Sequence, residues 1–507
     1  MRQPIRIAMS MQGITSILLC GSLVGCNVGP KYRPPAPPTV KTYTPSPQPS
    51  ETVSTTGSGG NSQHFNNSAD LPARWWTLFH SEKLDKLVRT ALENSPTLTQ
   101  AQARLLEAQE GLKAQTGATR YPSLDVKGSA QRQKLDLRAL GLPATIPNPG
   151  PFTLYNVSLN LSYTLDLFGA NRRELEALKA QVAYERFELE AARLTLASNV
   201  VSTAIRQASL RAQISATHHL IQVQTQQIAI TEKRYSSGGV AASDVESLHV
   251  ALAQTQGSAP LLEKQLAQVN HQLAVYLGKG PSEIQLEGID LSDLQLPQEL
   301  PLSMPSSLVQ QRPDIRAMES LLQQASANVG VANANLFPQI TLSAGGGSQR
   351  TNIADLANSM NVWNFGGNLL QPVFHGGQLR AEMRRATAAY DEAGAAYKET
   401  VLRGLMEVAN VLQAIEADAR TLKAKSEAAD HAQAGYQIAQ QRYDVGGISY
   451  LNLLEAERQH LQAVLDRTSA EGDRYTDSAT LHYALGGGWW NEGQNLTVST
   501  SHKTTVR

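Results

Sequence analysis

Cysteine is nearly absent from this sequence. The 507 residues include two, Cys20 and Cys26, and both lie in the first 26 positions. No later segment can form a disulfide, a cysteine-ligated zinc site or a thiol nucleophile. Net charge is absent as well, because 44 Lys and Arg balance 44 Asp and Glu. This balance disfavours nucleic acid as a partner.

Aromatic residues make up only 6% of the chain, and helix-breaking residues are missing from long stretches. The 68 residues between Gly169 and Gly238 include no Gly or Pro, and no proline follows Pro372. At 1.5 Å per residue, an uninterrupted helix of that length would reach ~100 Å. Helices of this length are typical of coiled-coil rods and not of a small globular core.

The segment that follows Gly239 has the heptad-spaced apolar seam of a coiled coil. The seam consists of Val245, Leu248, Leu252, Leu262, Leu266, Val269, Leu273 and Tyr276, and the spacing recurs at Leu451, Leu454, Leu461 and Leu465. Pro260 interrupts the first seam and is expected to bend that helix or unwind a turn. The glycine pairs 238–239 and 446–447 are therefore predicted to form the tips of two long helical hairpins.

Motifs that carry catalysis are also missing. The sequence has no G-x-S-x-G, no H-E-x-x-H and no phosphate-binding loop in a strand–turn–helix context. His218, His219 and His249 fall in helical stretches, where neighbouring side chains point in different directions, which disfavours a metal site. Acidic residues such as Glu174 and Glu188 are interpreted as a solvated helix face. The chain is predicted not to be an enzyme and to need no cofactor for catalysis.

Four segments are predicted to be strands. The clearest is 155–167, where apolar and polar residues alternate without a break. Weaker candidates are 123–133, 339–345 and 362–373, and polar loops at 135–153 and 346–361 join the strands in pairs. Strands of this length with one apolar face match a transmembrane barrel, in which a strand needs ~9–11 residues to cross. A fragment of a soluble β-sandwich is the alternative interpretation.

Four strands cannot close a barrel. An open sheet edge inside lipid would leave backbone groups without hydrogen bonds, at a cost of several kcal/mol each. If the strands span a membrane, other copies of the chain must complete the sheet.

One series of features occurs twice along the chain, which indicates an internal repeat. Pro122 and Pro338, each just before a strand, are 216 positions apart, and Arg234-Tyr235 and Arg442-Tyr443 are 208 apart. The predicted division is a first repeat at 71–277, an inter-repeat segment at 278–305, a second repeat at 306–485 and a flexible tail at 486–507.

The N-terminal 25 residues have the layout of an export signal: two arginines and then an apolar stretch. The stretch ends in Leu23-Val24-Gly25-Cys26, which resembles the bacterial lipobox. That resemblance implies cleavage before Cys26 and attachment of a diacylglycerol and an N-acyl chain, such as palmitate, to it. Asn27 in the next position implies sorting to the outer membrane. An ordinary signal peptide with an incidental cysteine is the alternative.

Residues 26–70 are predicted to be a linker. The stretch from residue 27 has eight prolines, many Ser, Thr and Gly, and almost no aliphatic side chains. We expect it to run extended along the surface of the folded body.

Short motifs spread over the chain form a family pattern. They are Val28-Gly29-Pro30-Lys31-Tyr32, Trp76 with Phe79, Leu165-Asp166-Leu167-Phe168-Gly169, Leu277-Gly278, Gln311-Arg312-Pro313-Asp314-Ile315, Ala332-Asn333-Ala334-Asn335-Leu336-Phe337-Pro338, Phe374-His375-Gly376-Gly377 and Ala484-Leu485-Gly486-Gly487-Gly488-Trp489. Together they resemble the outer-membrane efflux proteins, the TolC-like exit ducts of tripartite pumps, in their lipoprotein branch. The resemblance covers nearly all of the mature chain.

The resemblance implies a mainly α fold with a transmembrane β-barrel contribution. Long antiparallel helical hairpins would form an α-barrel through the periplasm, and four strands per chain would complete a twelve-stranded barrel in a homotrimer. The implied function is a passive outer-membrane channel that receives substrates from an inner-membrane transporter and a periplasmic adaptor. A lipid-anchored periplasmic adaptor or scaffold is the alternative, although the doubled pattern with four strands argues against it. The transported substrate is not predicted.

In this family the helical tips shut the inner end of the tunnel. Carried over by position, the tips are 234–244 and 442–451, and they would serve as gate and adaptor contact. The candidate residues are Arg234, Tyr235, Gly238, Gly239, Asp244, Arg442, Tyr443, Asp444, Gly446 and Gly447. Alternatively, Arg234 and Tyr235 only cap a helix C-terminus, where a cation complements the dipole. Ile448-Ser449 follow the second glycine pair, where some members have an acidic residue, so an acidic ring there is left open.

Overall fold

The computed structural model describes residues 28–45, 48–66, 70–136, 141, 143, 145, 147–283, 285, 287–358 and 360–491. The predicted signal peptide, Cys26 and residues 492–507 lie outside this part. The chain divides into two compact units, which we describe separately. The sheet unit consists of Met1–Pro34, Leu105–Tyr184 and Met318–Ala396, and the helical unit of Pro35–Arg104, Glu185–Ala317 and Tyr397–Arg507.

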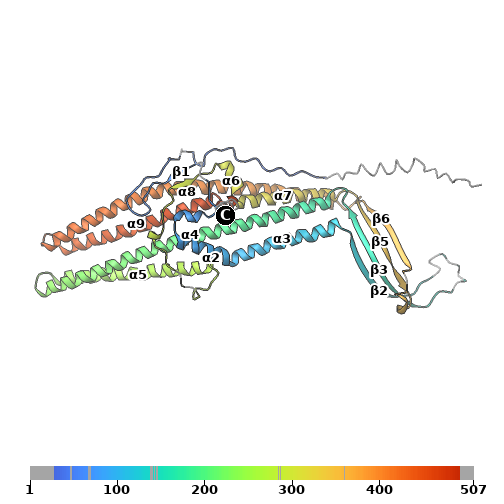
Figure 1. The fold of residues 1–507 in the computed structure, drawn as a ribbon, viewed down its shortest axis with the longest axis horizontal. Helices are drawn as coiled ribbons and strands as arrows, with labels where there is room; N and C mark the ends of the chain where they lie inside the picture. The colour runs from blue at the N-terminus through green and yellow to red at the C-terminus, as the bar shows by residue number, and fades with distance from the viewer. Residues whose placement is uncertain are drawn as a thin grey trace, which may run out of the picture. The chain divides into compact units, whose positions relative to one another are not determined.

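The sheet unit holds a four-stranded antiparallel sheet in the order β2-β3-β5-β6 (Figure 1). Its strands are β2 Ser123–Gln133, β3 Phe152–Leu165, β5 Gln339–Arg350 and β6 Val362–Leu370. Each predicted strand is present, but β5 runs five residues beyond the predicted end at 345. The glycines at 345–347 carry no alternation signal, yet their backbones pair with both neighbouring strands. The predicted loop at 346–361 therefore begins only after Arg350.

The sheet has one apolar and one polar face, as the period-two pattern predicts. The register places Leu124 beside Leu161, Leu161 beside Ala344, and Ala344 beside Phe365, so one apolar row crosses all four strands. The apolar side chains stay exposed, at 66% for Leu124 and 77% for Phe365. Edge strands β2 and β6 have a strand partner on one side only within the described residues.

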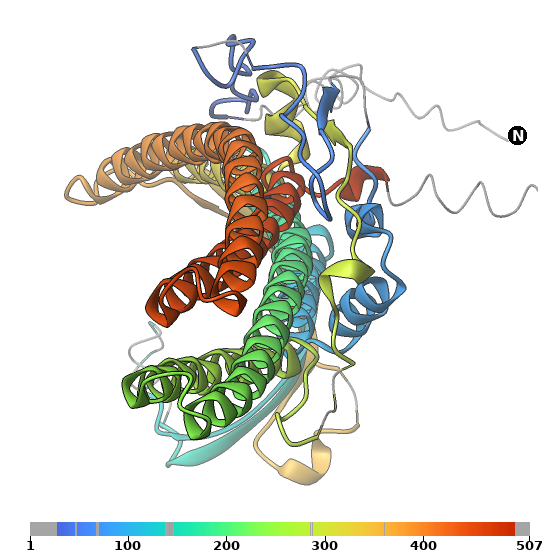
Figure 2. The same cartoon turned by 90° about the vertical axis from the view of Figure 1, so that its left-hand side faces the viewer.

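Two long helical hairpins form most of the remaining chain (Figures 1 and 2). The helices are α4 Ala170–Ser236, α5 Ala242–Tyr276, α8 Gln378–Asp444 and α9 Tyr450–Ala484. Helices α4 and α8 both have 67 residues, and α5 and α9 both have 35, which matches the internal repeat. Pro260 lies inside α5 without unwinding it, because a proline removes one N–H donor while the flanking turns keep theirs.

Shorter helices precede the strands. Helix α2 Glu82–Asn94 and helix α3 Pro96–Arg120 are separated at Ser95, because Pro96 favours the first turn of a new helix. Before the second pair of strands come α6 Pro305–Gln311 and α7 Pro313–Ala334. None of the helices in the described ranges has a stretch long and apolar enough to cross a membrane.

Part of the core of the helical unit lies where residues 75–79 pack against the C-terminal half of α9. The 3₁₀ helix η1 Trp75–Phe79 buries Trp75 against His482 of α9, with ring centroids 5.4 Å apart. Phe79 packs against Tyr475 at 6.3 Å. Burial of such large rings supplies much of the apolar area that holds this unit together.

The predicted linker includes a packed segment. Strand β1 His64–Asn66 pairs in parallel with β4 Glu299–Pro301. The buried guanidinium of Arg474 donates hydrogen bonds to the carbonyl oxygens of Gly59 at 2.8 Å and Asn61 at 2.7 Å. Composition could not predict this attachment, because backbone carbonyls and not apolar side chains provide it.

The start of the predicted flexible tail is also packed. Trp489 Nε1 donates to the Gln311 carbonyl oxygen at 2.7 Å, and Asn491 Nδ2 donates to Asp70 Oδ1 and the Leu71 carbonyl oxygen at 2.9 Å each. The prediction of a flexible tail from residue 486 is therefore wrong for 486–491.

Candidate functional site

The two hairpin tips are built alike. Gly238 and Gly446 adopt φ values of +75° and +73°, a left-handed conformation that favours glycine at the end of a helix. Gly239 N donates to the Arg234 carbonyl oxygen at 2.8 Å, and Gly447 N donates to the Arg442 carbonyl oxygen at 2.7 Å. These bonds satisfy carbonyls that the helix ends would otherwise leave unpaired. Thus the four glycines set the backbone of the tips.

Three predicted site residues from different hairpins come together. Arg234 Nη2 lies 3.5 Å from Asp444 Oδ1, and the Arg234 guanidinium lies 5.4 Å from the centre of the Tyr443 ring. Both contacts join residues more than 200 positions apart. The Arg234–Asp444 pair is exposed, so its attraction is weak and easily broken.

The other candidate residues lie apart from this contact. Tyr235 is 50% exposed, and Arg442 is exposed too. Asp244 caps α5, because its Oδ2 accepts a hydrogen bond from Ala241 N at 3.3 Å. The Arg234 side chain thus contacts the other hairpin, whereas Asp244 caps its own helix. In the second tip, Ser449 Oγ caps α9 by accepting from Asn452 N at 3.4 Å.

A cluster of apolar and tyrosine side chains, the sub-tip cluster, lies behind this contact. Its buried members are Ile228 of α4, Leu248 of α5, and Tyr450 and Leu453 of α9, with Tyr436 and Tyr443 of α8 packed against them. The Tyr443 and Tyr450 rings meet edge to face at 5.2 Å. The sub-tip cluster thus joins side chains from all four long helices.

Tyr436, Tyr450 and Glu457 are not among the candidate residues named from the sequence, although Tyr450 lies within the predicted tip 442–451. A signal was available, because Tyr436 and Tyr443 are seven residues apart, as are Tyr450 and Glu457. Residues seven apart lie on the same face of a helix, so the two members of each pair share a face.

The pKa values of Tyr436 and Tyr450 in the sub-tip cluster, and of the nearby Glu457 on α9, are raised. Burial raises the pKa of Glu457 to about 7. Burial and the nearby Glu457 carboxylate raise the pKa of Tyr436 to about 12, and they also raise the pKa of Tyr450. A low dielectric environment disfavours the charged form of each group.

A groove opens beside the second tip. It has a volume of 610 Å³ and is lined mainly by α5 and α9. Its walls mix apolar side chains, including Val250 and Leu451, with polar ones, including Glu246, Glu455 and Arg458. Such a wall can accept an amphipathic helix from a partner.

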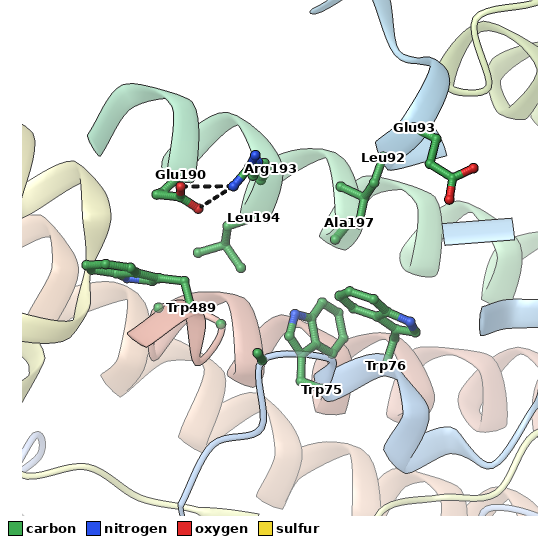
Figure 3. Close-up of a pocket in the computed structure, with 12 residues that line it drawn as sticks. Trp75, Trp76, Leu92, Glu93, Glu190, Arg193, Leu194, Ala197 and Trp489 are labelled. Atoms are coloured by element: carbon green, nitrogen blue, oxygen red, sulfur yellow. Dashed lines mark hydrogen bonds and ion pairs between the residues drawn. The ribbon is translucent and has the colours of Figure 1, made fainter. Parts of the chain in front are cut away.

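A second pocket, of 240 Å³, lies in the core region of the helical unit (Figure 3). Trp489 lies on one side of Leu194, with Trp75 and Trp76 on the other. Arg193 Nη1 forms a 3.0 Å ion pair with Glu190 at the edge. The walls offer no pairing of a nucleophile with a base, and in the described ranges no three His, Cys, Asp or Glu side chains could hold a metal ion.

The sequence of this chain is similar to those of known outer-membrane proteins. The family model described as "Outer membrane efflux protein" matches residues 87–279 and 304–487. The pyoverdine export outer membrane protein OpmQ of Pseudomonas aeruginosa is 32% identical over 429 residues, covering 83% of this chain and 89% of OpmQ. The cation efflux system protein CusC of Escherichia coli O157:H7 is 28% identical over 472 residues, covering 92% of this chain and 97% of CusC.

Solved structures agree with the sequence relatives. The outer-membrane channel OprN superposes with a TM-score of 0.79 at 28% identity, covering 92% of this chain and all of that one. The outer membrane protein VceC of Vibrio cholerae superposes with a TM-score of 0.75 at 28% identity, covering 83% of this chain and all of that one. The predicted fold class, with long helical hairpins and a four-strand contribution from each chain, is confirmed. The chain belongs to the outer membrane efflux protein family.

Proposed function

We propose that this protein is the outer-membrane channel of a tripartite efflux system, a passive duct that conveys substrates out of the cell. One observation carries the proposal: a single chain of this family combines an amphipathic four-stranded sheet with two long hairpins. The sheet suits a membrane and the hairpins suit a periplasmic tunnel. No enzymatic step is part of this function.

The sheet supports assembly as a homotrimer. Strands β2 and β6 are the sheet edges, and their apolar side chains are exposed. In lipid, unpaired edges are costly, whereas β6 of one copy beside β2 of the next satisfies both. Three copies would give a twelve-stranded barrel that places the protein in the outer membrane, with lipid around its apolar face.

The tips support a gate at the periplasmic end. An exposed Arg234–Asp444 pair is weak enough to break when a partner binds. We assign the partners as a periplasmic adaptor protein, which would contact the tips and the groove beside them, and an inner-membrane transporter. Diacylglycerol and N-acyl lipid on Cys26 would add a second anchor.

The substrate is left open by this proposal. The names of two relatives refer to different substrates, pyoverdine for OpmQ and cations for CusC. A wide duct filters solutes weakly, so the transporter behind it would select the cargo.

The test combines assembly with conduction. Native mass spectrometry of the detergent-purified protein is expected to give a trimer, and the trimer is expected to form pores in a planar bilayer. A stable monomer, or a trimer without pores under every condition, including with the tip variants below, would overturn the proposal. A protein that stays soluble without detergent after removal of Cys26 would support the adaptor alternative.

The tip contact gives a prediction of its own. Tyr443→Ala removes the ring that contacts both Arg234 and Tyr450, so we expect the closed end to loosen and single-channel conductance to rise. Arg442→Ala, from the sequence-based gate set, is expected to raise conductance less, because Arg442 is exposed. Tyr235→Ala, at the equivalent position of the first hairpin, is the matched control. Equal conductance in Tyr443→Ala and wild type would argue against a gating role.

A further inference from the structure

Glu457 occupies an unusual place for a carboxyl group. It lies on α9 seven residues after Tyr450, and only 1% of it is exposed. Neither carboxylate oxygen has a hydrogen-bond partner among the described residues. A buried carboxylate without a partner is strongly disfavoured relative to the neutral acid.

The groups around Glu457 do not supply a compensating positive charge. Tyr436 of α8 and Tyr450 of α9 both sense its charge. Around them lie Tyr443 of α8 and Asp244 of α5, which act on Tyr450, and His460, which stacks on Tyr436 at 5.8 Å. The nearby cations act on other rings: Arg234 lies over the Tyr443 ring, and burial together with the charge of Arg467 lowers the pKa of His460. The packed arrangement therefore favours a neutral Glu457.

The first hairpin shows that the fold itself does not require this arrangement. The position equivalent to Glu457, 208 residues earlier, is His249. The His249 side chain is 47% exposed, and its Nε2 lies 3.5 Å from Glu232 Oε1. The same place in the repeat is thus exposed and paired in one hairpin, but buried and unpaired in the other.

We infer that Glu457 is a proton-responsive gating residue, which keeps the tip end of the second hairpin packed while neutral and loosens it when ionised. The loosened state would let water reach the carboxylate and would separate Tyr443 and Tyr450, which lie directly behind the Arg234–Asp444 contact. This inference rests on the proposed function, because it assumes that the tips close the tunnel.

The direction of the pH effect follows from linkage. Burial raises the pKa of Glu457 from its ordinary value of 4.5 to about 7, so the packed state binds the proton more tightly than the loosened state. Below the ordinary pKa both states are neutral and pH has no effect through this group. Between these two pKa values, rising pH favours the loosened state. Above about pH 7, the opening equilibrium no longer changes with pH through this group. From about pH 5.5 to 7.5, we expect the opening equilibrium to rise roughly twentyfold.

The experiment compares the full-length trimer with two variants, each of which has one Glu→Gln substitution. Glu457→Gln keeps the shape but cannot ionise. Glu427→Gln is the matched control, because it makes the same chemical change at an exposed glutamate of α8 that belongs to neither the sub-tip cluster nor the groove. Each trimer is measured at both pH values by single-channel recording and by hydrogen exchange of peptides that cover 436–457.

We expect open probability and hydrogen exchange to rise together with pH in the wild type and in Glu427→Gln. Once exchange is corrected for its intrinsic pH dependence, Glu457→Gln should show a smaller pH response in both measurements. Other groups, such as Asp418 and Asp477, whose pKa values burial also raises, would affect all three proteins alike, so the difference between Glu457→Gln and the other two proteins reports on Glu457. An equal pH response in Glu457→Gln and wild type would overturn the inference.

The two proposals can fail separately. If no trimer conducts but hydrogen exchange still follows the Glu457 titration, the channel function is wrong and with it the gating role. If all trimers conduct with the same pH dependence, only the role of Glu457 is wrong. Should Glu457→Gln fail to assemble, Glu457→Met, which is also neutral and of similar length, takes its place.

Discussion

Replacing Arg312 with alanine is expected to lower the free energy of unfolding by about 3 kcal/mol. The Arg312 guanidinium is 5% exposed and donates to Asp314 Oδ2 at 2.7 Å, to Glu407 Oε2 at 2.6 Å and to the Ala484 carbonyl oxygen at 3.1 Å. It therefore ties the start of α7 to α8 and to the end of α9. Its removal would leave a buried carbonyl and two carboxylates without their donor.

The size of this effect is limited by solvent. The Asp314 and Glu407 side chains are 39% and 40% exposed, so water replaces part of what they lose, and we expect the lower end of the range for broken buried ion pairs. The measurement is the midpoint of urea unfolding, followed by helical circular dichroism. Arg403→Ala is the control, because it breaks an exposed pair with Glu399 and should cost less than about 1 kcal/mol. Equal urea midpoints for Arg312→Ala and Arg403→Ala would show that the buried contacts of Arg312 contribute no more to stability than an exposed ion pair.

The second large effect is expected at Gly347 in the middle of the sheet. A Cβ atom at this position would lie 2.2 Å from the Val157 carbonyl oxygen and 2.7 Å from the Ser158 Cα, both of them backbone atoms. Strands β3 and β5 would have to separate to accept any side chain, and their ladder bonds would be lost. We expect Gly347→Ala to reduce the yield of assembled trimer by at least about tenfold, a factor that corresponds to about 1.4 kcal/mol.

The sheet offers a matched control for this change. A Cβ atom at Gly366 on β6 would meet only the Ser343 hydroxyl oxygen, at 3.9 Å, which is an ordinary contact distance. Gly366→Ala makes the same chemical change in the same sheet and should assemble normally. The assembled trimer is quantified by electrophoretic mobility with and without heating. A normal yield of Gly347→Ala would mean that the strands tolerate the added methyl group.

The strands and helices could be predicted because their signals are local. A strand exposes alternate residues to opposite faces, so 155–167 reveals its period without reference to any other segment. The long helices follow from the absence of Gly and Pro, and the glycine pairs mark where they turn. The prediction failed at 346–350, where glycine leaves no side-chain pattern, and at 486–491, where polar contacts hold a segment of loop-like composition. The contacts that attach the linker to the helical unit are also polar, so composition does not reveal them.

The sequence by itself determined the repeat, the four amphipathic strands and the two glycine tips of this protein, because each depends on the conformational preferences of neighbouring residues. Only the tertiary structure decided which tip residues meet. Arg234 is 210 positions from Asp444, and their contact depends on how the two hairpins pack. Likewise, the seven-residue spacing from Tyr450 sets Glu457 apart from its exposed neighbour Glu455, but the spacing does not show which of the two is buried. Burial raises the pKa of Glu457, and a side chain becomes buried only when helices distant in sequence pack together.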